Sequence, residues 1–182
     1  MTELEIQTLV ERTKSGDRDA YATLYERFVD QIYRYVYFRV NQDDAEDIVE
    51  TVFVKAWENI SKYSNNGSTF SSWLFRIAHN LVVDHYRHAK TIEELTEEHQ
   101  EHRADYHPKI TTERKIEGDL LKEGLKHLKD DYQQFLVLKY INELSNRDIS
   151  QMLKKSEGSL RILQYRALKA LKVVLEDMGM KW

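Results

Sequence analysis

Residues 154–172 carry six basic side chains against one acidic side chain, in a chain whose net charge is −4. Apolar residues at helical spacing predict a helix with one buried side, made of Leu160, Leu163, Ala167, Leu168, Leu171 and Leu175. A basic helix of this kind fits a polyanionic partner, and a plain solvated helix face is the alternative.

Nucleic acid is the polyanion that this helix is best suited to read. A recognition helix in the major groove contacts base edges with its N-terminal part, where this segment has Ser159, Arg161, Ile162 and Tyr165. Arg161 alone among these four can make a bidentate contact with guanine. The other basic residues are placed for phosphate contacts, which give affinity without sequence information: Lys154, Lys155, Arg166, Lys169 and Lys172.

A second polar face is expected on a helix over residues 70–90. Its outer side would carry Arg76, Asn80, Asp84, Arg87 and His88, after a polar loop at residues 63–69. Amides, an acid and arginines beside aromatic rings suit unstacked single-stranded bases. The alternative is a solvated face over an aromatic core, and we favour a core position for Phe70, Trp73 and Phe75.

A third face is acidic and lies on a helix expected over residues 44–62. The side opposite its apolar stripe holds Asp43, Asp47, Glu50, Thr51 and Val54. It could dock a basic surface of a partner protein, and solvation of the charges is again the alternative.

The residues do not predict an enzyme. There is no cysteine, so a thiol nucleophile, a disulfide and a cysteine-ligated zinc are excluded. The histidine pairs His85/His88 and His99/His102 are three residues apart, but no HExxH motif, glycine-rich phosphate loop or GxSxG motif accompanies them. We therefore predict no catalytic residue, no metal and no cofactor.

Helices must position all three faces, because 182 residues contain one proline and six glycines. We predict an all-α protein with helical blocks at residues 1–90 and 113–182. A flexible acidic linker at residues 91–112 joins the two blocks. In the first block, a helix over residues 4–14 stops at Gly16, Asp17 caps the next helix, and Ala20, Leu24, Phe28, Ile32, Val36 and Val40 form its buried stripe.

The second block is expected to contain a helix-turn-helix. One helix runs from Glu113 to about Leu128 and another covers residues 132–141. A capping box at Ser145–Asp148 starts a short helix over residues 146–153, a turn follows at residues 154–155, and Ser156 caps the long basic helix. Acidic residues near the start and the lack of an apolar run of about 18 residues predict a cytoplasmic protein without membrane insertion.

Four segments, in this order, resemble the extracytoplasmic-function sigma factors, a group within the sigma-70 family of promoter-recognition subunits of bacterial RNA polymerase: GDRDAYATLYERF, DAEDIVETVFVKAW, FSSWLFRIAHNLVVDHYRH and LSNRDISQMLKKSEGSLRILQYRALKALK. The resemblance covers nearly the whole chain. It implies a region-2-like domain at residues 1–90 for polymerase binding and the minus-ten element, and a region-4-like domain at residues 113–182 for the minus-thirty-five element.

The resemblance also implies partners: core RNA polymerase, promoter DNA that is duplex at minus thirty-five and single-stranded at minus ten, and an anti-sigma factor. The rival hypothesis is a stand-alone helix-turn-helix transcriptional regulator. The implied polymerase contacts are Asp47, Glu50, Thr51 and Val54, although the family usually has Gln and then Glu at positions 50 and 51.

The implied DNA contacts form two sets. The minus-ten set is Tyr63, Asn65, Asn66, Ser68, Arg76, Asn80, Asp84 and Arg87. The minus-thirty-five set is Arg147, Lys155, Ser156, Ser159, Arg161, Ile162, Tyr165, Arg166 and Lys169.

Overall fold

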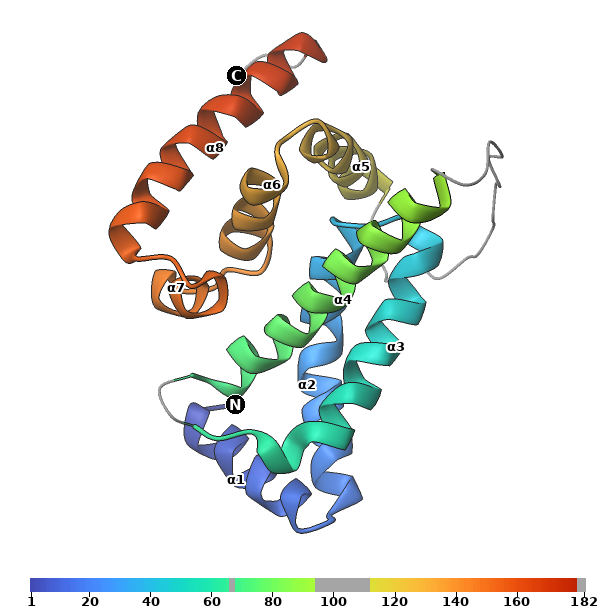
Figure 1. Cartoon of the computed structure of the whole chain (residues 1–182), viewed down its shortest axis with the longest axis vertical. Helices are drawn as coiled ribbons and strands as arrows, with labels where there is room; N and C mark the ends of the chain where they lie inside the picture. The colour runs from blue at the N-terminus through green and yellow to red at the C-terminus, as the bar shows by residue number, and fades with distance from the viewer. Residues whose placement is uncertain (66–67, 94–111, 180–182) are drawn as a thin grey trace. The chain divides into compact units, whose positions relative to one another are not determined.

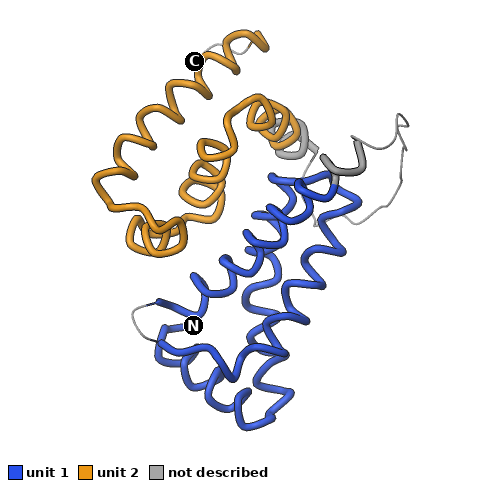
Figure 2. The backbone as a smooth tube through the Cα atoms, viewed as in Figure 1, with its two compact units in different colours: residues 1–102 blue, residues 103–182 orange. Residues whose placement is uncertain are grey.

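The computed structural model describes residues 1–65, 68–93 and 112–179, and all regular structure within these ranges is helical. The prediction of an all-α protein is therefore confirmed. The chain divides into two compact units, residues 1–102 and residues 103–182 (Figure 2). Most of the expected linker, residues 94–111, lies outside the described ranges.

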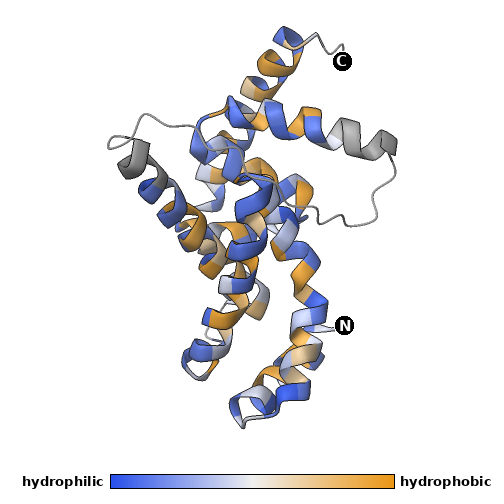
Figure 3. Ribbon diagram, turned by 90° about the vertical axis from the view of Figure 1, so that its right-hand side faces the viewer, coloured by the Kyte–Doolittle hydropathy of each residue, from blue (hydrophilic) through white to orange (hydrophobic). Residues whose placement is uncertain are grey.

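The N-terminal unit contains α1 (Glu3–Lys14), α2 (Arg18–Tyr37), α3 (Gln42–Asn59), the short helix η1 (Ile60–Lys62) and α4 (Phe70–Glu93). Helices α2, α3 and α4 pack against one another, and α1 packs on α2 and η1 (Figure 1). Apolar residues recur about once per turn in the helices, with polar residues between them, so one face of a helix can pack in the core while the other faces solvent (Figure 3).

A side-chain cap starts α2, as the sequence predicted for Asp17. One Asp17 carboxylate oxygen accepts from the backbone N–H groups of Asp19 and Ala20, both at 3.0 Å. The other oxygen pairs with Arg12 at 2.7 Å. The Ala20 N–H and then Arg12 lower the pKa of Asp17 below its usual value, since both favour the ionised carboxyl. Gly16, at φ +92°, supplies the left-handed residue between α1 and α2.

The predicted apolar stripe is buried at all six positions, although α2 ends at Tyr37 and Val40 follows the helix. The neighbouring helices are less evenly covered. Trp57, which continues the apolar periodicity of α3, remains 38% exposed and contacts Tyr21 edge-on at 4.9 Å between ring centroids. In α4, Phe70 and Phe75 are buried as expected, whereas Trp73, also expected in the core, is only half-buried.

The C-terminal unit contains α5 (Thr112–Lys126), α6 (Asp130–Leu136), η2 (Val137–Ile141), α7 (Asn146–Leu153) and α8 (Glu157–Asp177). The single helix expected over residues 132–141 is instead α6 followed by one π-helical turn, η2. Helix α8 packs on α5, α6 and α7, so its orientation is fixed by all three.

The helix-turn-helix is present as predicted. The Ser145 hydroxyl accepts from the Asp148 N–H at 3.1 Å at the start of α7. Lys154 adopts the left-handed conformation (φ 53°) after α7, and the Ser156 hydroxyl accepts from the Ser159 N–H at 3.2 Å at the start of α8. Four of the six residues expected on the buried side of α8 are buried, namely Leu160, Ala167, Leu171 and Leu175. Leu163 is only half-buried, and Leu168 is 40% exposed, so its core assignment is wrong.

No helix within the described ranges is long and apolar enough to cross a membrane.

Candidate nucleic-acid interface

The outer face of α8 presents the predicted base-reading residues to solvent. Ile162 is 56% exposed and Tyr165 is 69% exposed, and Ser159, Arg161, Arg166 and Lys169 are also exposed. Within the described part of the chain, the side chain of Arg161 has no hydrogen bond or ion pair. Its guanidinium is therefore available to an external acceptor.

Two serines of the predicted minus-thirty-five set form hydrogen bonds at the start of α8. The Ser156 hydroxyl caps the helix, and it shares a hydrogen bond of 2.9 Å with the hydroxyl of Ser159. These hydroxyls thus have internal partners, which sequence reasoning assigned only for Ser156.

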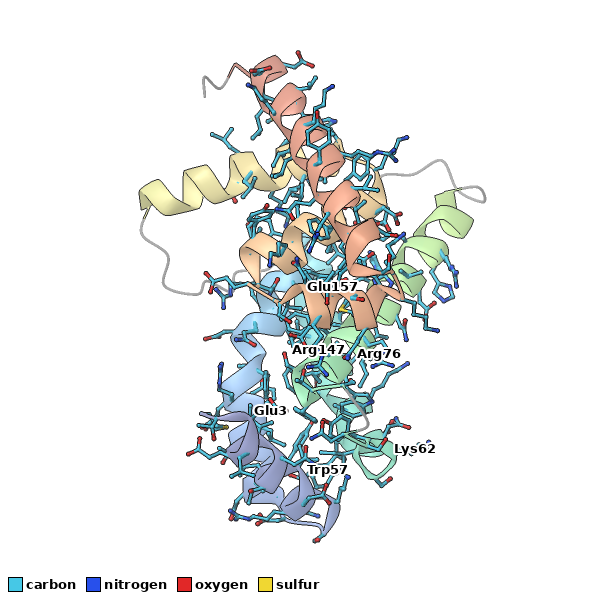
Figure 4. The ribbon with its side chains drawn as sticks, turned by 90° about the vertical axis from the view of Figure 1, so that its left-hand side faces the viewer. Glu3, Trp57, Lys62, Arg76, Arg147 and Glu157 are labelled. Atoms are coloured by element: carbon cyan, nitrogen blue, oxygen red, sulfur yellow. The ribbon has the colours of Figure 1, made fainter. Side chains whose placement is uncertain are left out.

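The basic residues around the turn differ in their partners. Lys155 forms a 3.4 Å ion pair with Asp131 of α6, which ties the turn to the preceding helix. Arg147 is exposed on α7, and no ion pair joins it to another residue that the structure describes (Figure 4). Exposed ion pairs contribute little to stability, so Lys155 remains free to exchange Asp131 for a phosphate.

Sequence reasoning missed a polar contact beside this face. The amide of Gln164 donates to the Tyr140 hydroxyl at 2.8 Å, which links α8 to the π-helical turn η2. Tyr140 is 48% exposed. Nothing in the local sequence pattern signals this contact, because the two residues are 24 positions apart.

The second polar face combines α4 with the residues before it. Asn65, Asn80, Asp84 and Arg87 are exposed, and Asp84 and Arg87 form a 3.7 Å pair along the helix. Arg76 is half-buried and donates from Nη2 to the Ser68 hydroxyl at 3.3 Å. The side chain of Asn80 has no hydrogen bond to any residue within the described ranges. Asn66 lies outside those ranges.

Tyr63, expected among the DNA contacts, is 3% exposed and belongs to the core of the N-terminal unit. Its ring packs against Phe70 and Trp73, with centroid distances of 5.5 and 5.3 Å. Burial, together with the charges of Glu3 and Glu11, raises the pKa of Tyr63 to about 12. The aromatic core that the sequence favoured for this region thus includes Tyr63 as well.

The outer face of α3 holds the predicted protein-docking residues. Asp47, Glu50 and Val54 are exposed, with Val54 at 49%. Thr51 is half-buried, and its hydroxyl donates to the Asp47 carbonyl at 2.8 Å. Sequence reasoning missed the exposed aromatic side chains of Trp57 and of Tyr25, which is 43% exposed.

The structure describes one of the two histidine pairs, His85 and His88. His85 lies 3.4 Å from Asp44, and His88 is exposed. His99 and His102 fall outside the described ranges. Within those ranges, no three histidine or acidic side chains gather as metal ligands would.

These features define a class: an all-helical protein with a helix-turn-helix in one compact unit and a polar helical face in another. Residues 24–92 match the family model "Sigma-70 region 2", and residues 119–171 match "Sigma-70, region 4". The two matches fall in the two units.

Curated relatives identify the group within this class. The chain is 31% identical over 187 residues to the ECF RNA polymerase sigma factor SigW of Bacillus subtilis, covering 97% of this chain and 100% of that one. It is also 31% identical over 172 residues to the ECF RNA polymerase sigma factor BldN of Streptomyces coelicolor, covering 93% of this chain and 65% of BldN. The chain belongs to the ECF RNA polymerase sigma factors.

A solved structure shares the fold. It shows the sigma factor RpoE in complex with the anti-sigma factor NepR from Bartonella quintana. The TM-score is 0.72 at 19% sequence identity, with 86% of this chain and 96% of that chain covered. The family models and the curated relatives together show that the protein is an RNA polymerase sigma factor, so the rival hypothesis of a stand-alone regulator is not favoured.

Proposed function

We propose that this sigma factor binds core RNA polymerase, directs it to promoters with two elements, and helps to open them by capturing bases of the melted minus-ten strand. In this proposal α8 reads the duplex minus-thirty-five element, and α4 with the preceding loop reads the minus-ten strand. Capture of unstacked bases favours the open state through binding energy, so the chain itself needs no catalytic residue. Sigma factors are initiation factors, and we propose that this chain catalyses no reaction.

One observation carries the proposal: each unit presents, on a defined helix, a polar side chain suited to reading bases that has no internal bond. Arg161 on α8 and Asn80 on α4 are both exposed and unbonded within the described part of the chain. An arginine fork suits guanine in the major groove, and an amide suits the edge of a splayed base. Both residues are thus available to DNA without disturbing the fold.

We infer the protein partners from the exposed face of α3 and from a related structure. The exposed Asp47, Glu50 and Val54 offer acidic contacts around an apolar centre, which suits a basic surface of the polymerase. The related RpoE structure contains an anti-sigma factor. We propose that an anti-sigma factor also controls this chain, by covering its polymerase-facing surface, and that the protein acts in the cytoplasm.

The test is transcription from a pool of promoter sequences by bacterial core polymerase, with and without this protein, followed by sequencing of the transcript starts. Discrete start sites that depend on the protein are expected, and their upstream sequences give both elements. The isolated protein should bind the same duplexes weakly. Tight, specific binding of the isolated protein as a dimer, without new start sites alongside its cognate polymerase, would support a stand-alone regulator instead.

A further inference from the structure

Residues 63–69 join η1 to α4, and the side chain of Tyr63 connects the start of this segment to Ser68 near its end. The Tyr63 hydroxyl donates to the Ser68 carbonyl at 3.1 Å, a contact named here the loop-closing hydrogen bond. The Tyr63 N–H donates to the Ile60 carbonyl at 3.0 Å, so the residue is held at the end of η1 as well. The two bonds hold Ser68 at a fixed distance from the end of η1.

The ring of Tyr63 fixes this bond in space. It is nearly fully buried among aromatic rings of α4, and the Lys14 ammonium of α1 lies 5.6 Å from its centroid. Glu3 and Glu11 of α1 are close enough to raise its pKa. Contacts with α1 and α4 thus hold the hydroxyl in place. Figure 4 labels Glu3 of α1, Lys62 of η1 and Arg76 of α4.

The far end of the bond leads directly to the DNA-facing surface. Ser68, whose carbonyl accepts from Tyr63, uses its hydroxyl to accept from Arg76 Nη2 at 3.3 Å. The next residue, Thr69, accepts from the Ser72 N–H at 3.1 Å and thereby caps the first turn of α4. Within the described ranges, the buried Nε of Arg76 has no hydrogen-bond partner, so Ser68 is the group that orients this guanidinium.

We propose that Tyr63 is a positioning residue for minus-ten recognition. Through the loop-closing hydrogen bond it sets Ser68, and through Ser68 it sets Arg76, so the buried hydroxyl governs base preference without touching DNA. This inference rests on the proposed function and deepens it, because it assigns the shape of the minus-ten site to a hydrogen bond made by a buried side chain.

The test compares Tyr63→Phe with a matched variant, Tyr21→Phe. Phenylalanine keeps the ring of Tyr63 in its aromatic cluster and removes only the hydroxyl. Tyr21 also donates its hydroxyl to a backbone carbonyl, that of Phe53, but it is remote from the loop in the sequence, and within the described ranges no hydrogen bond joins it to Ser68. Each substitution thus removes one tyrosine-to-carbonyl hydrogen bond, and the two should cost similar stability in a thermal melt.

The measurement is the rate of promoter opening by the reconstituted holoenzyme on promoters that carry each of the four bases at every minus-ten position. For Tyr63→Phe, we compare the opening rates with the best and the next-best base at the minus-ten position that Ser68 and Arg76 are proposed to read. The ratio of these two rates should fall by about threefold to tenfold, the range that one hydrogen bond of ordinary net strength allows. Polymerase affinity and minus-thirty-five preference should stay at wild-type values. Tyr21→Phe should leave the base ratio unchanged.

A second pair of variants tests the route through Ser68. If Tyr63 acts through Ser68, Tyr63→Phe and Ser68→Ala should be non-additive in their effects on the base ratio. An unchanged ratio in Tyr63→Phe, or an equal change in Tyr21→Phe, would overturn the inference while wild-type transcription still supports the proposed function. A wild-type protein that gives no start sites with its cognate polymerase would overturn both.

Discussion

Replacing Arg161 with alanine should separate base reading from general DNA affinity. The side chain is exposed and has no internal bond within the described part of the chain, so the free energy of unfolding should change by less than about 0.5 kcal/mol. A bidentate contact with a base is worth about 1–3 kcal/mol of discrimination, which corresponds to a factor of roughly 5 to 150. The whole effect should therefore appear in DNA binding.

The assay is equilibrium binding of the reconstituted holoenzyme to duplexes with the preferred minus-thirty-five element and with each single substitution in it. Arg161→Ala should weaken binding to the preferred element and leave binding to a duplex already substituted at the contacted base nearly unchanged. Lys169→Ala is the matched control, because Lys169 is also exposed on α8 and has no internal ion pair within the described ranges.

The control should behave as a phosphate contact. Lys169→Ala should weaken binding to every duplex by the same factor, and should reduce the slope of log affinity against log salt by about one. If Arg161→Ala instead gave a uniform loss on all sequences, Arg161 would be a phosphate contact, and the assignment of base reading to the N-terminal part of α8 would be refuted.

Three further substitutions test the other surfaces and the packing of α8. Asn80→Ala should slow promoter opening by the holoenzyme about tenfold and change the affinity of the closed complex less than twofold, because a melted base is contacted only after opening. Stopped-flow fluorescence of a labelled promoter measures both quantities. A larger effect on closed-complex affinity than on opening would refute the role of Asn80. Val54→Asp should lower affinity for core polymerase at least tenfold by burying a charge in the interface, whereas Leu4→Asp, at a 78% exposed position on α1, should not; equal effects in a titration of labelled polymerase would exclude α3 as the docking face. A Cβ added at Gly124 would lie 2.8 Å from a methyl group of Leu175 in α8, so Gly124→Ala should lower the unfolding free energy by about 1–2 kcal/mol even after the gain in helix propensity. Gly118 has open space around it, so Gly118→Ala should raise the unfolding free energy by about 0.5–1 kcal/mol. Denaturant unfolding measures both. If both glycine substitutions stabilised the protein, α5 would be able to shift away from α8 and make room for the added methyl group, and the expected clash at Gly124 would be refuted.

Features set by neighbours in the sequence could be predicted without a structure. The buried stripe of α2 repeats every four residues, and Asp17, Ser145 and Ser156 each cap a helix that begins at the next residue. These interactions span four residues or fewer, so their pattern is visible in the chain itself. The two units and the helix-turn-helix follow from the same local signals.

Features set by contacts between helices could not be predicted in this way. Trp57 and Leu168 continue the apolar periodicity of their helices, but no neighbouring helix covers them completely, and they stay 38% and 40% exposed. Tyr63 shows the reverse case, because it stands in a polar stretch of the sequence and is buried by α1 and α4, one of which precedes it and one of which follows it in the chain. A residue's own segment does not record how much of its surface a distant helix will cover.

The predicted DNA-facing residues fall into two groups that should respond differently to mutation. Arg161 and Asn80 have no internal bonds within the described ranges, so DNA alone constrains them, and their loss should leave the free protein intact. Tyr63, Ser68 and Arg76 are joined by hydrogen bonds, so a change in one alters the geometry of the others. Base preference set by Arg161 or Asn80 should therefore change one residue at a time, whereas preference set by Ser68 and Arg76 should depend on combinations of residues, including Tyr63, which does not reach the DNA.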